Sequence, residues 1–269
     1  MDFFYITNDS QEASIAQKAG VSHIFIDLEV NGKEERQKNM DTVKSSHEIE
    51  DIIAIKEIAT TSKILVRVNP IYFDSMCEIN KAIDFGANVI MLPYFKTTEE
   101  VKKFIDIVGK RAETILLLET KQSVEILDEI CKIEGIDRIH IGLNDLSLSL
   151  KKSFMFELIS DGTVEKISNK LKTYNIPFGF GGISTLNTGM LPAENILKEH
   201  IRLGSNSVIL SRSFKKSVIN KYGCSNFEEG FKEELSAIEN FLEIPIDFNS
   251  NDNLSEIDLV IKEIINGKH

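Results

Sequence analysis

Acidic residues follow two apolar runs of the sequence, at positions where they could share a divalent cation. Glu119 ends the run TILLLE, and Asp145 comes shortly after the run RIHIGL. If the two runs are neighbouring strands of a barrel, both carboxylates lie at the same mouth. Two carboxylates with water ligands suit Mg²⁺ or Mn²⁺ and leave positions open for a substrate. The alternative is that both carboxylates only cap the helices that follow.

An arginine and a turn add groups that would bind a 2-keto acid beside such a cation. Arg67 ends the run KILVR, and Gly142, Leu143 and Asn144 follow the run RIHI. Arg67 would place a fixed positive charge beside the keto oxygen and stabilise an enolate, to which the cation adds Lewis-acid character. Backbone N–H groups of the turn could hold the substrate carboxylate. A structural ion pair of Arg67 with a nearby carboxylate is the alternative, and one arginine could serve both roles.

Further candidates lie at the ends of three other runs. Asp27 and Glu29 alternate at the end of HIFIDLE, so both side chains would face the same side, where either could transfer protons or orient Arg67. Gly182 and Arg212 follow the runs IPFGF and SVILS. A glycine lets backbone N–H groups approach an anion, and Arg212 could pair with that anion. A tight turn with a surface arginine is the alternative for this second pair.

A regular alternation of apolar runs and amphipathic segments would position these residues. Eight runs are typical of strands and cover residues 3–7, 23–29, 63–69, 88–93, 114–119, 138–143, 176–180 and 207–211. Charged segments with helical spacing separate them, which predicts parallel βα units. The length of 269 residues fits one α/β (β/α)₈ TIM barrel. A doubly wound open sheet is the alternative, weakened by the missing glycine-rich dinucleotide motif after the first run.

Two regions fall outside this alternation. Residues 30–46 form a long polar connection after the second run, where active-site loops of a barrel lie. At the other end, we expect a catalytic barrel domain over residues 1–245, closed by a helix FEEGFKEELSAIENFLEI. A C-terminal helical extension would cover residues 246–269, with LSEIDLVIKEIINGK as one more amphipathic helix. Such a helix docks on its own barrel or on a neighbouring subunit.

Composition and charge exclude several classes of function. A net charge of −11 argues against general binding to nucleic acid or to an anionic membrane. Three cysteines without a CxxC pair predict neither a disulfide framework nor a zinc cluster, and a reducing cytoplasm is the expected setting. The N-terminal residues MDFFYITNDSQEAS have no basic region and no long apolar run, so we expect no signal peptide. No apolar run reaches about 18 residues, so we expect no membrane span.

The histidines offer little support for a catalytic base. His23 and His140 lie within expected strands, so we predict packed side chains rather than ligands. His47 follows the polar connection at an expected helix start, and a catalytic role there is the less favoured interpretation.

The sequence resembles the HpcH/HpaI aldolase and citrate lyase β-subunit family. The matching segments run over about residues 20–150 and are FIDLE, VRVNP, GANVIMLPYFKTTEEV, LLLETKQSVEILDEI and IHIGLNDLSLSL. IGLNDLS with an upstream ET is the most specific pair, and weaker likeness continues to about residue 214. The resemblance implies a (β/α)₈ barrel whose last helix is often exchanged between subunits, and hence a homo-oligomer.

The resemblance also implies roles for the site residues. It places Glu119 and Asp145 as metal ligands, Arg67 at the keto oxygen, and the backbone of Gly142, Leu143 and Asn144 at the carboxylate. The sequence departs from the family at Val30, where members carry His or Asp directly after the acidic pair. Asp27, Glu29, a metal-bound water or a residue of a neighbouring subunit could then supply the missing acid/base group.

These observations predict a metal-dependent carbon–carbon lyase or aldolase that acts on a pyruvate- or oxaloacetate-like 2-keto acid through a metal-stabilised enolate, with an aldehyde as the expected partner. Two alternatives stay open. A phosphate-binding barrel isomerase would use the GFGGIS and LSRSF loops and bind phosphate without needing a metal. A non-catalytic barrel subunit or binding protein, favoured by Val30, would bind metal or ligand without turnover.

Overall fold

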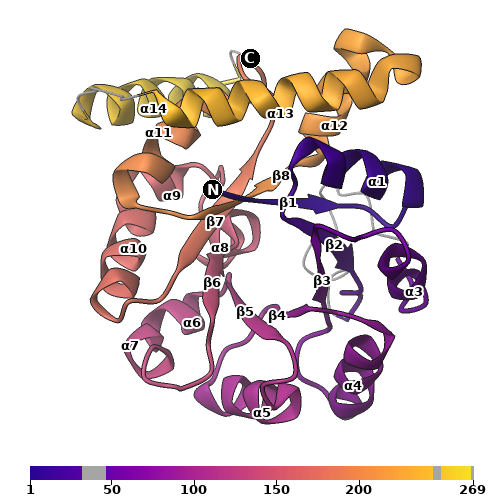
Figure 1. Cartoon of the computed structure of the whole chain (residues 1–269). Coiled ribbons are helices and arrows are strands. Elements are labelled where there is room, and N and C mark those ends of the chain that lie inside the picture. Colours follow the sequence, from indigo (N-terminus) through magenta and orange to yellow (C-terminus); the bar gives the residue numbers. More distant parts are fainter. Residues whose placement is uncertain (32–46, 245–249, 268–269) are drawn as a thin grey trace.

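The strands close into one barrel. In the computed structural model, which describes residues 1–31, 47–244 and 250–267, eight parallel strands pair in chain order and β8 returns to β1 (Figure 1). The strands are β1 (Asp2–Ile6), β2 (His23–Asp27), β3 (Lys63–Arg67), β4 (Val89–Leu92), β5 (Glu113–Leu118), β6 (Arg138–Ile141), β7 (Phe178–Ile183) and β8 (Ser207–Leu210). The closed barrel confirms the TIM-barrel prediction and excludes the open sheet. Each of the eight expected runs contains or overlaps one strand.

Helices surround the barrel and carry the chain back from each strand to the next. They include α1 (Ser10–Ala19), α3 (Asp51–Lys56), α4 (Ser75–Phe85), α5 (Thr98–Val108), α6 (Lys121–Glu125), α7 (Leu127–Ile130), α10 (Thr163–Thr173), α11 (Ala193–Leu203), α12 (Arg212–Tyr222) and α13 (Phe227–Glu243). The local sequence explains α5 well. Thr97 and Glu100 form a capping box at its start, and Gly109 ends it in the left-handed conformation. Its buried Val101, Phe104 and Val108 recur at helical spacing.

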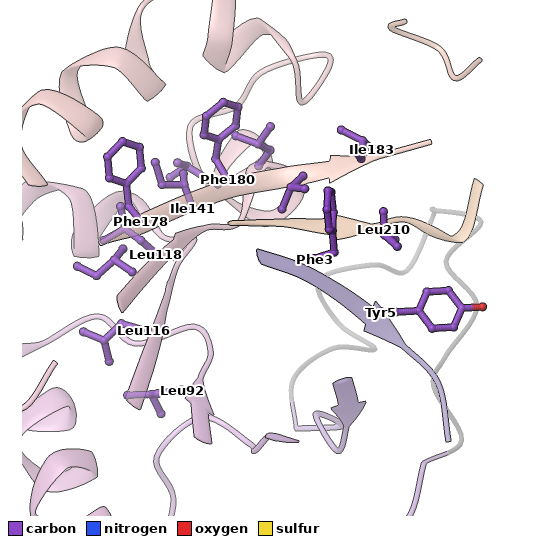
Figure 2. Close-up of a cluster of buried hydrophobic side chains, with 14 of the residues drawn as sticks. Phe3, Tyr5, Leu92, Leu116, Leu118, Ile141, Phe178, Phe180, Ile183 and Leu210 are labelled. Carbon is purple, nitrogen blue, oxygen red and sulfur yellow. The ribbon is translucent and has the colours of Figure 1, made fainter. Parts of the chain in front are cut away.

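The alternation of side chains along the strands divides the core into two layers. Outward residues such as Phe3, Tyr5 and Leu116 pack in the larger layer between strands and helices (Figure 2). Inward residues fill the barrel interior and are Phe4, Phe25, Leu65, Val89, Met91, Ile115 and Leu117. Each such side chain contributes about 1.5–3 kcal/mol through burial. The filled interior leaves the polar strand ends as the place for a site.

Two short connections near the expected site are helical, which differs from the prediction of turns and loops. The expected turn at Gly142–Asp145 is the first turn of α8 (Leu143–Ser149). The expected LSRSF loop instead ends β8 and begins α12, with Ser211 in extended conformation at the helix N-cap. Helical periodicity was hard to detect in α12 because only Phe214 and Val218 are buried among its many polar residues. Both helices bring their first, intrahelically unpaired N–H groups to the strand ends.

The terminal helices lie along one side of the barrel (Figure 1). The last helix, α14 (Ser250–Ile265), begins four residues earlier than expected and packs on α11 and α9 (Glu157–Ser160). Ile257 and Ile261 are buried, and Asn253 Nδ2 donates to Glu199 Oε1 at 2.8 Å. This confirms a C-terminal helix, while the domain boundary at residue 245 and an exchange between subunits stay predictions.

Parts of two predicted segments lie outside the described residues, namely 32–46 of the polar connection and 245–249 before α14. Within the described ranges, we find no helix that is both long and apolar enough to cross a membrane.

Candidate active site

One cavity at the C-terminal ends of the strands collects most of the predicted site residues. It has a volume of about 290 Å³, which suits a small organic acid. Its lining includes Glu29, Arg67, Glu119, Gly142, Leu143, Asn144, Asp145, Gly182 and Arg212. Asp27 is the one predicted site residue outside this lining, and its carboxylate accepts hydrogen bonds from Arg67.

The two proposed metal ligands reach the cavity from adjacent elements. Glu119 follows β5 and is 3% exposed, and Asp145 lies in the first turn of α8 and is 8% exposed. The backbone N–H of Tyr94 donates to Glu119 Oε1 at 3.0 Å. Tyr94 has a φ of 51°, so the chain adopts an unfavourable conformation where it contacts this carboxylate. No sequence feature singles out Tyr94, because only its backbone conformation makes it a partner of Glu119.

Gly142 makes room for the Glu119 carboxylate. A Cβ atom at this position would lie 2.7 Å from Glu119 Oε2 and 2.9 Å from Glu119 Cβ, closer than such atoms approach. No group of three or more His, Cys, Asp or Glu side chains suited to a metal occurs in the described part of the chain. A cation here would therefore take two protein carboxylates, with water and substrate as its other ligands, which is a usual set for Mg²⁺.

Arg67 is fixed by carboxylates at and just after the end of β2. Its Nε lies 2.9 Å from Asp27 Oδ1 and its Nη2 lies 2.8 Å from Asp27 Oδ2, while Nε is 3.5 Å from Glu29 Oε2. Burial alone would lower the pKa of Arg67, but the charges of Asp27, Glu29 and Glu119 outweigh burial and raise it. The guanidinium thus stays charged where it lines the cavity. Arg67 is both an ion-pair partner and a cavity residue, as the sequence allowed.

Val30, which follows β2, contributes no side chain to the cavity lining. This side chain is 60% exposed, and Val30 is not among the residues described as lining the cavity. Asn69 Oδ1 holds the turn by accepting from the backbone N–H groups of Val30 and Asn31, each at 2.9 Å. Asn69 belongs to the VRVNP segment, which was the available signal for its role. The position where the family carries His or Asp thus offers no acid/base group.

The predicted anion-binding residues meet in β7 and at the start of α12. Gly181, Gly182, Ser211 and Arg212 line the same cavity. Gly181 has a φ of 56°, a backbone conformation that favours glycine, and a Cβ there would lie 2.7 Å from Leu143 Cδ1, so the end of that side chain would have to shift. Arg212 is exposed at the start of α12. The arrangement brings these groups together, and anion binding by Gly182 and Arg212 stays a prediction.

Two histidines lie closer to the site than the sequence suggested. His140 is buried as expected, but it also lines the cavity together with Phe25, Met91 and Leu117. His47 Nδ1 accepts a hydrogen bond from the backbone N–H of Asp27 at 2.9 Å. His140 was difficult to single out because strand alternation does not reveal which face of an isolated run points into a barrel.

A TIM barrel with paired carboxylates and a fixed arginine at its C-terminal mouth has the arrangement of an aldolase or lyase. The family model for HpcH/HpaI aldolase/citrate lyase matches residues 2–199, and the chain belongs to this family. This confirms the resemblance and supports an aldolase or lyase kind of activity. A comparison with curated protein sequences found no match.

Solved structures share the fold. The HpcH/HpaI aldolase from Desulfitobacterium hafniense DCB-2 has a TM-score of 0.61 and 15% identity, with coverage of 92% of this chain and 95% of the other. The citrate synthase SbnG has a TM-score of 0.62 and 18% identity, and the match covers 85% of this chain and 93% of SbnG. Macrophomate synthase has a TM-score of 0.57 and 15% identity, and the match covers 89% of this chain and 85% of the synthase. At these identities the likeness establishes the fold alone.

Proposed function

We propose that the protein is a divalent-metal-dependent carbon–carbon lyase or aldolase that acts on a pyruvate- or oxaloacetate-like 2-keto acid through an enolate. The observation that carries this proposal is the joint lining of one cavity by Glu119, Asp145 and Arg67. Membership of the HpcH/HpaI aldolase/citrate lyase family supports it.

Glu119 and Asp145 would hold the metal, Mg²⁺ or Mn²⁺. Their fit is supported by Gly142, whose missing side chain leaves the space that the Glu119 carboxylate occupies. A bound cation would supply Lewis-acid polarisation of the keto group. The Tyr94 N–H fixes one oxygen of Glu119, which limits the orientations that the carboxylate can take.

Arg67 and the start of α8 would bind the keto acid itself. The Arg67 guanidinium, held by Asp27, would donate to the keto oxygen and stabilise the negative charge that develops there in the enolate. The backbone N–H groups of Leu143 and Asn144 lie in the first helical turn, where they have no intrahelical acceptor. They would receive the substrate carboxylate, as anions commonly bind at helix N-termini.

Glu29 is the better candidate for proton transfer of the two acids at and just after the end of β2. Both carboxylate oxygens of Asp27 accept from Arg67, so Asp27 serves to position the guanidinium. Glu29 lines the cavity directly and lies farther from Arg67, at 3.5 Å. We therefore assign acid/base work to Glu29 or to a water that it orients. An aldehyde as second substrate, a cytoplasmic setting and a homo-oligomeric state belong to the same proposal.

A phosphate-binding isomerase is the second candidate, and one observation favours it. Gly182 and Arg212 line the same cavity beside the start of α12, so a phosphate could bind there. This function predicts tight binding of inorganic phosphate without a metal. The non-catalytic alternative draws on Val30, whose exposed side chain cannot transfer protons, and it predicts ligand binding without turnover.

Deuterium exchange tests the proposed function. The protein is incubated with pyruvate in D₂O, with EDTA, Mg²⁺ or Mn²⁺, and the methyl signal is followed by proton NMR. We expect metal-dependent loss of the signal, and a loss of rate of at least about 100-fold in Arg67→Ala, because this charge acts on the enolate. Glu119→Gln should lose both exchange and Mn²⁺ binding. Exchange that persists in EDTA would overturn the proposal, and so would the absence of exchange with both Mg²⁺ and Mn²⁺.

A further inference from the structure

One asparagine amide holds the backbone on both sides of Glu29. Asn69 lies just after β3 and is 7% exposed. Its Nδ2 donates to the carbonyl oxygen of Leu28 at 3.3 Å, and its Oδ1 accepts from the backbone N–H of Val30 at 2.9 Å. The Leu28 carbonyl belongs to the peptide unit before Glu29, and the Val30 N–H belongs to the unit after it. A single side chain therefore contacts both peptide units that flank Glu29.

Contacts with both peptide units restrict the backbone torsions of Glu29. Because each peptide unit is planar, the orientations of the two units set φ and ψ of the residue between them. These torsions in turn determine which side-chain rotamers are allowed. The backbone N–H of Glu29 also donates to Asp27 Oδ1 at 3.2 Å. The Glu29 side chain, which is 2% exposed and lines the cavity, thus extends from a fixed backbone.

Glu78 of α4 holds the Asn69 amide in turn. Glu78 Oε1 accepts from Asn69 Nδ2 at 2.7 Å and from the backbone N–H of Asn69 at 3.2 Å. On its other side, the amide meets the backbone N–H groups of Val30 and Asn31, each 2.9 Å from Oδ1. Oxygen acceptors on one side and N–H donors on the other leave one orientation for the amide. Through Asn69, α4 is therefore joined to the residues after β2.

We infer that Asn69 and Glu78 are positioning residues that aim the Glu29 carboxylate at the substrate for proton transfer. The inference rests on the proposed function, which assigns acid/base work to Glu29. A general acid or base must lie within hydrogen-bonding distance of the proton that it transfers, and small displacements lower the rate. Neither Asn69 nor Glu78 lines the cavity that the described residues form, so both would act through Glu29 and not on the substrate.

A double-mutant cycle separates this positioning from a general effect on the fold. Metal-dependent exchange of pyruvate in D₂O is measured, and the rate without protein is subtracted. We expect Glu29→Gln to lower the rate by at least about 100-fold and Asn69→Ala to lower it by about 10- to 100-fold. In the Glu29→Gln background, Asn69→Ala should change the residual rate by less than about twofold, because the group that it positions has already been removed.

A matched control removes a similar hydrogen bond far from the cavity. Asn88 Oδ1 accepts from the backbone N–H of Ile64 at 2.8 Å, near the N-terminal ends of β3 and β4. We expect Asn88→Ala to keep the rate of pyruvate exchange within about twofold of the wild type, since distant sites act independently. Thermal midpoints establish that each variant folds.

Two substitutions of Glu78 repeat the test if Asn69→Ala does not fold. Glu78→Ala should lower the rate of pyruvate exchange by about tenfold, because the Asn69 amide is then free to turn. Glu78→Gln keeps an oxygen acceptor for Asn69 and should restore most of the rate. As with Asn69→Ala, the loss in Glu78→Ala should disappear in the Glu29→Gln background.

Hydrogen exchange of the backbone amides of Val30 and Asn31 gives a measurement that needs no reaction. Both N–H groups should lose at least about tenfold of their protection in Asn69→Ala and keep it in Asn88→Ala, because only the first substitution removes their acceptor. Nuclear magnetic resonance resolves the two amides separately.

The outcomes distinguish this inference from the proposed function. An equal fall of the pyruvate rate in both Glu29 backgrounds would overturn the inference, because Asn69 would then act on the fold or on another group. An unchanged rate or unchanged protection in Asn69→Ala would also overturn it, and the proposed reaction would stand. Absence of pyruvate exchange in the wild type would overturn the proposed reaction, and the protection of Val30 would then decide alone whether Asn69 positions Glu29.

Discussion

At the scale of the residue, the strength of one ion pair separates the roles of two neighbouring acids. Asp27 contacts Arg67 through both oxygens at 2.8 and 2.9 Å, while Glu29 approaches it at 3.5 Å. A buried guanidinium that loses a charged partner destabilises a protein by about 3–5 kcal/mol. We expect Asp27→Asn to reduce the free energy of unfolding by about 2–4 kcal/mol, because one of two acceptors stays. Urea denaturation measures this change.

Glu29→Gln is the matched control, since it removes the same charge two residues farther along the chain, just after β2. We expect it to cost less stability than Asp27→Asn, because its nearest contact with Arg67 is longer. If Glu29 transfers protons, its variant should also alter the pH profile of pyruvate exchange, whereas Asp27→Asn should lower the rate at every pH. Equal losses of stability, or a pH profile that moves only in Asp27→Asn, would reverse this assignment.

Single residues of the site were predictable where chemistry and strand position coincide. Glu119 and Arg67 end apolar runs and Asp145 shortly follows one, and a barrel brings strand ends together, so their joint lining of one cavity could be expected. Tyr94 could not be found in this way, because its contribution is a backbone N–H set by a positive φ. Arg67 forms its two short contacts with Asp27 and not with Glu29. This pairing depends on the strand register, which a single sequence does not specify.

At the scale of the element, the close approach of α8 to the end of β5 depends on Gly142. We expect Gly142→Ala to displace the Glu119 carboxylate, because the new methyl group would lie 2.7 Å from its Oε2. Shifted ligands commonly lose metal affinity by about 10- to 100-fold. Titration with Mn²⁺, followed by electron paramagnetic resonance, would measure this loss.

Gly182→Ala is the control for this substitution. Its Cβ would meet Ile209 O at 3.3 Å and Ser211 Cβ at 3.5 Å, so only a small adjustment is needed, and Glu119 is not among its neighbours. We expect its Mn²⁺ affinity to stay within about twofold of the wild type. An unchanged affinity in Gly142→Ala would mean that Glu119 does not hold the metal.

Strands were easier to predict than the short helices at their ends. All eight runs are strands because buried parallel strands are nearly continuous in apolar and β-branched residues. By contrast, α8 spans seven residues, and α12 buries only Phe214 and Val218. Neither provides enough apolar positions for a helical period to stand out. For this reason α8 and α12, which bring N–H groups to the cavity, were predicted as turns or loops.

At the scale of the whole molecule, three buried histidines couple folding to pH. Burial lowers the pKa of His23 and of His140 to about 4, and that of His200 to about 3. The ordinary value of 6.5 applies to the unfolded chain. Above pH 6.5 each ring is neutral in both states and adds no pH dependence. As the pH falls from 6.5 towards 4, the unfolded chain binds protons that the folded chain does not, so stability is lost.

The expected slope follows from the number of protons. Each histidine contributes about 1.4 kcal/mol per pH unit within this window, and three contribute about 4 kcal/mol per unit. Chemical denaturation at pH 7, 6 and 5 measures the slope. His200→Asn should reduce the histidine contribution by about one third, since its amide can still contact Ser205 Oγ, the present partner of His200 Nδ1 at 2.8 Å. Acidic residues affect both proteins equally, so identical slopes would show that His200 does not titrate on unfolding.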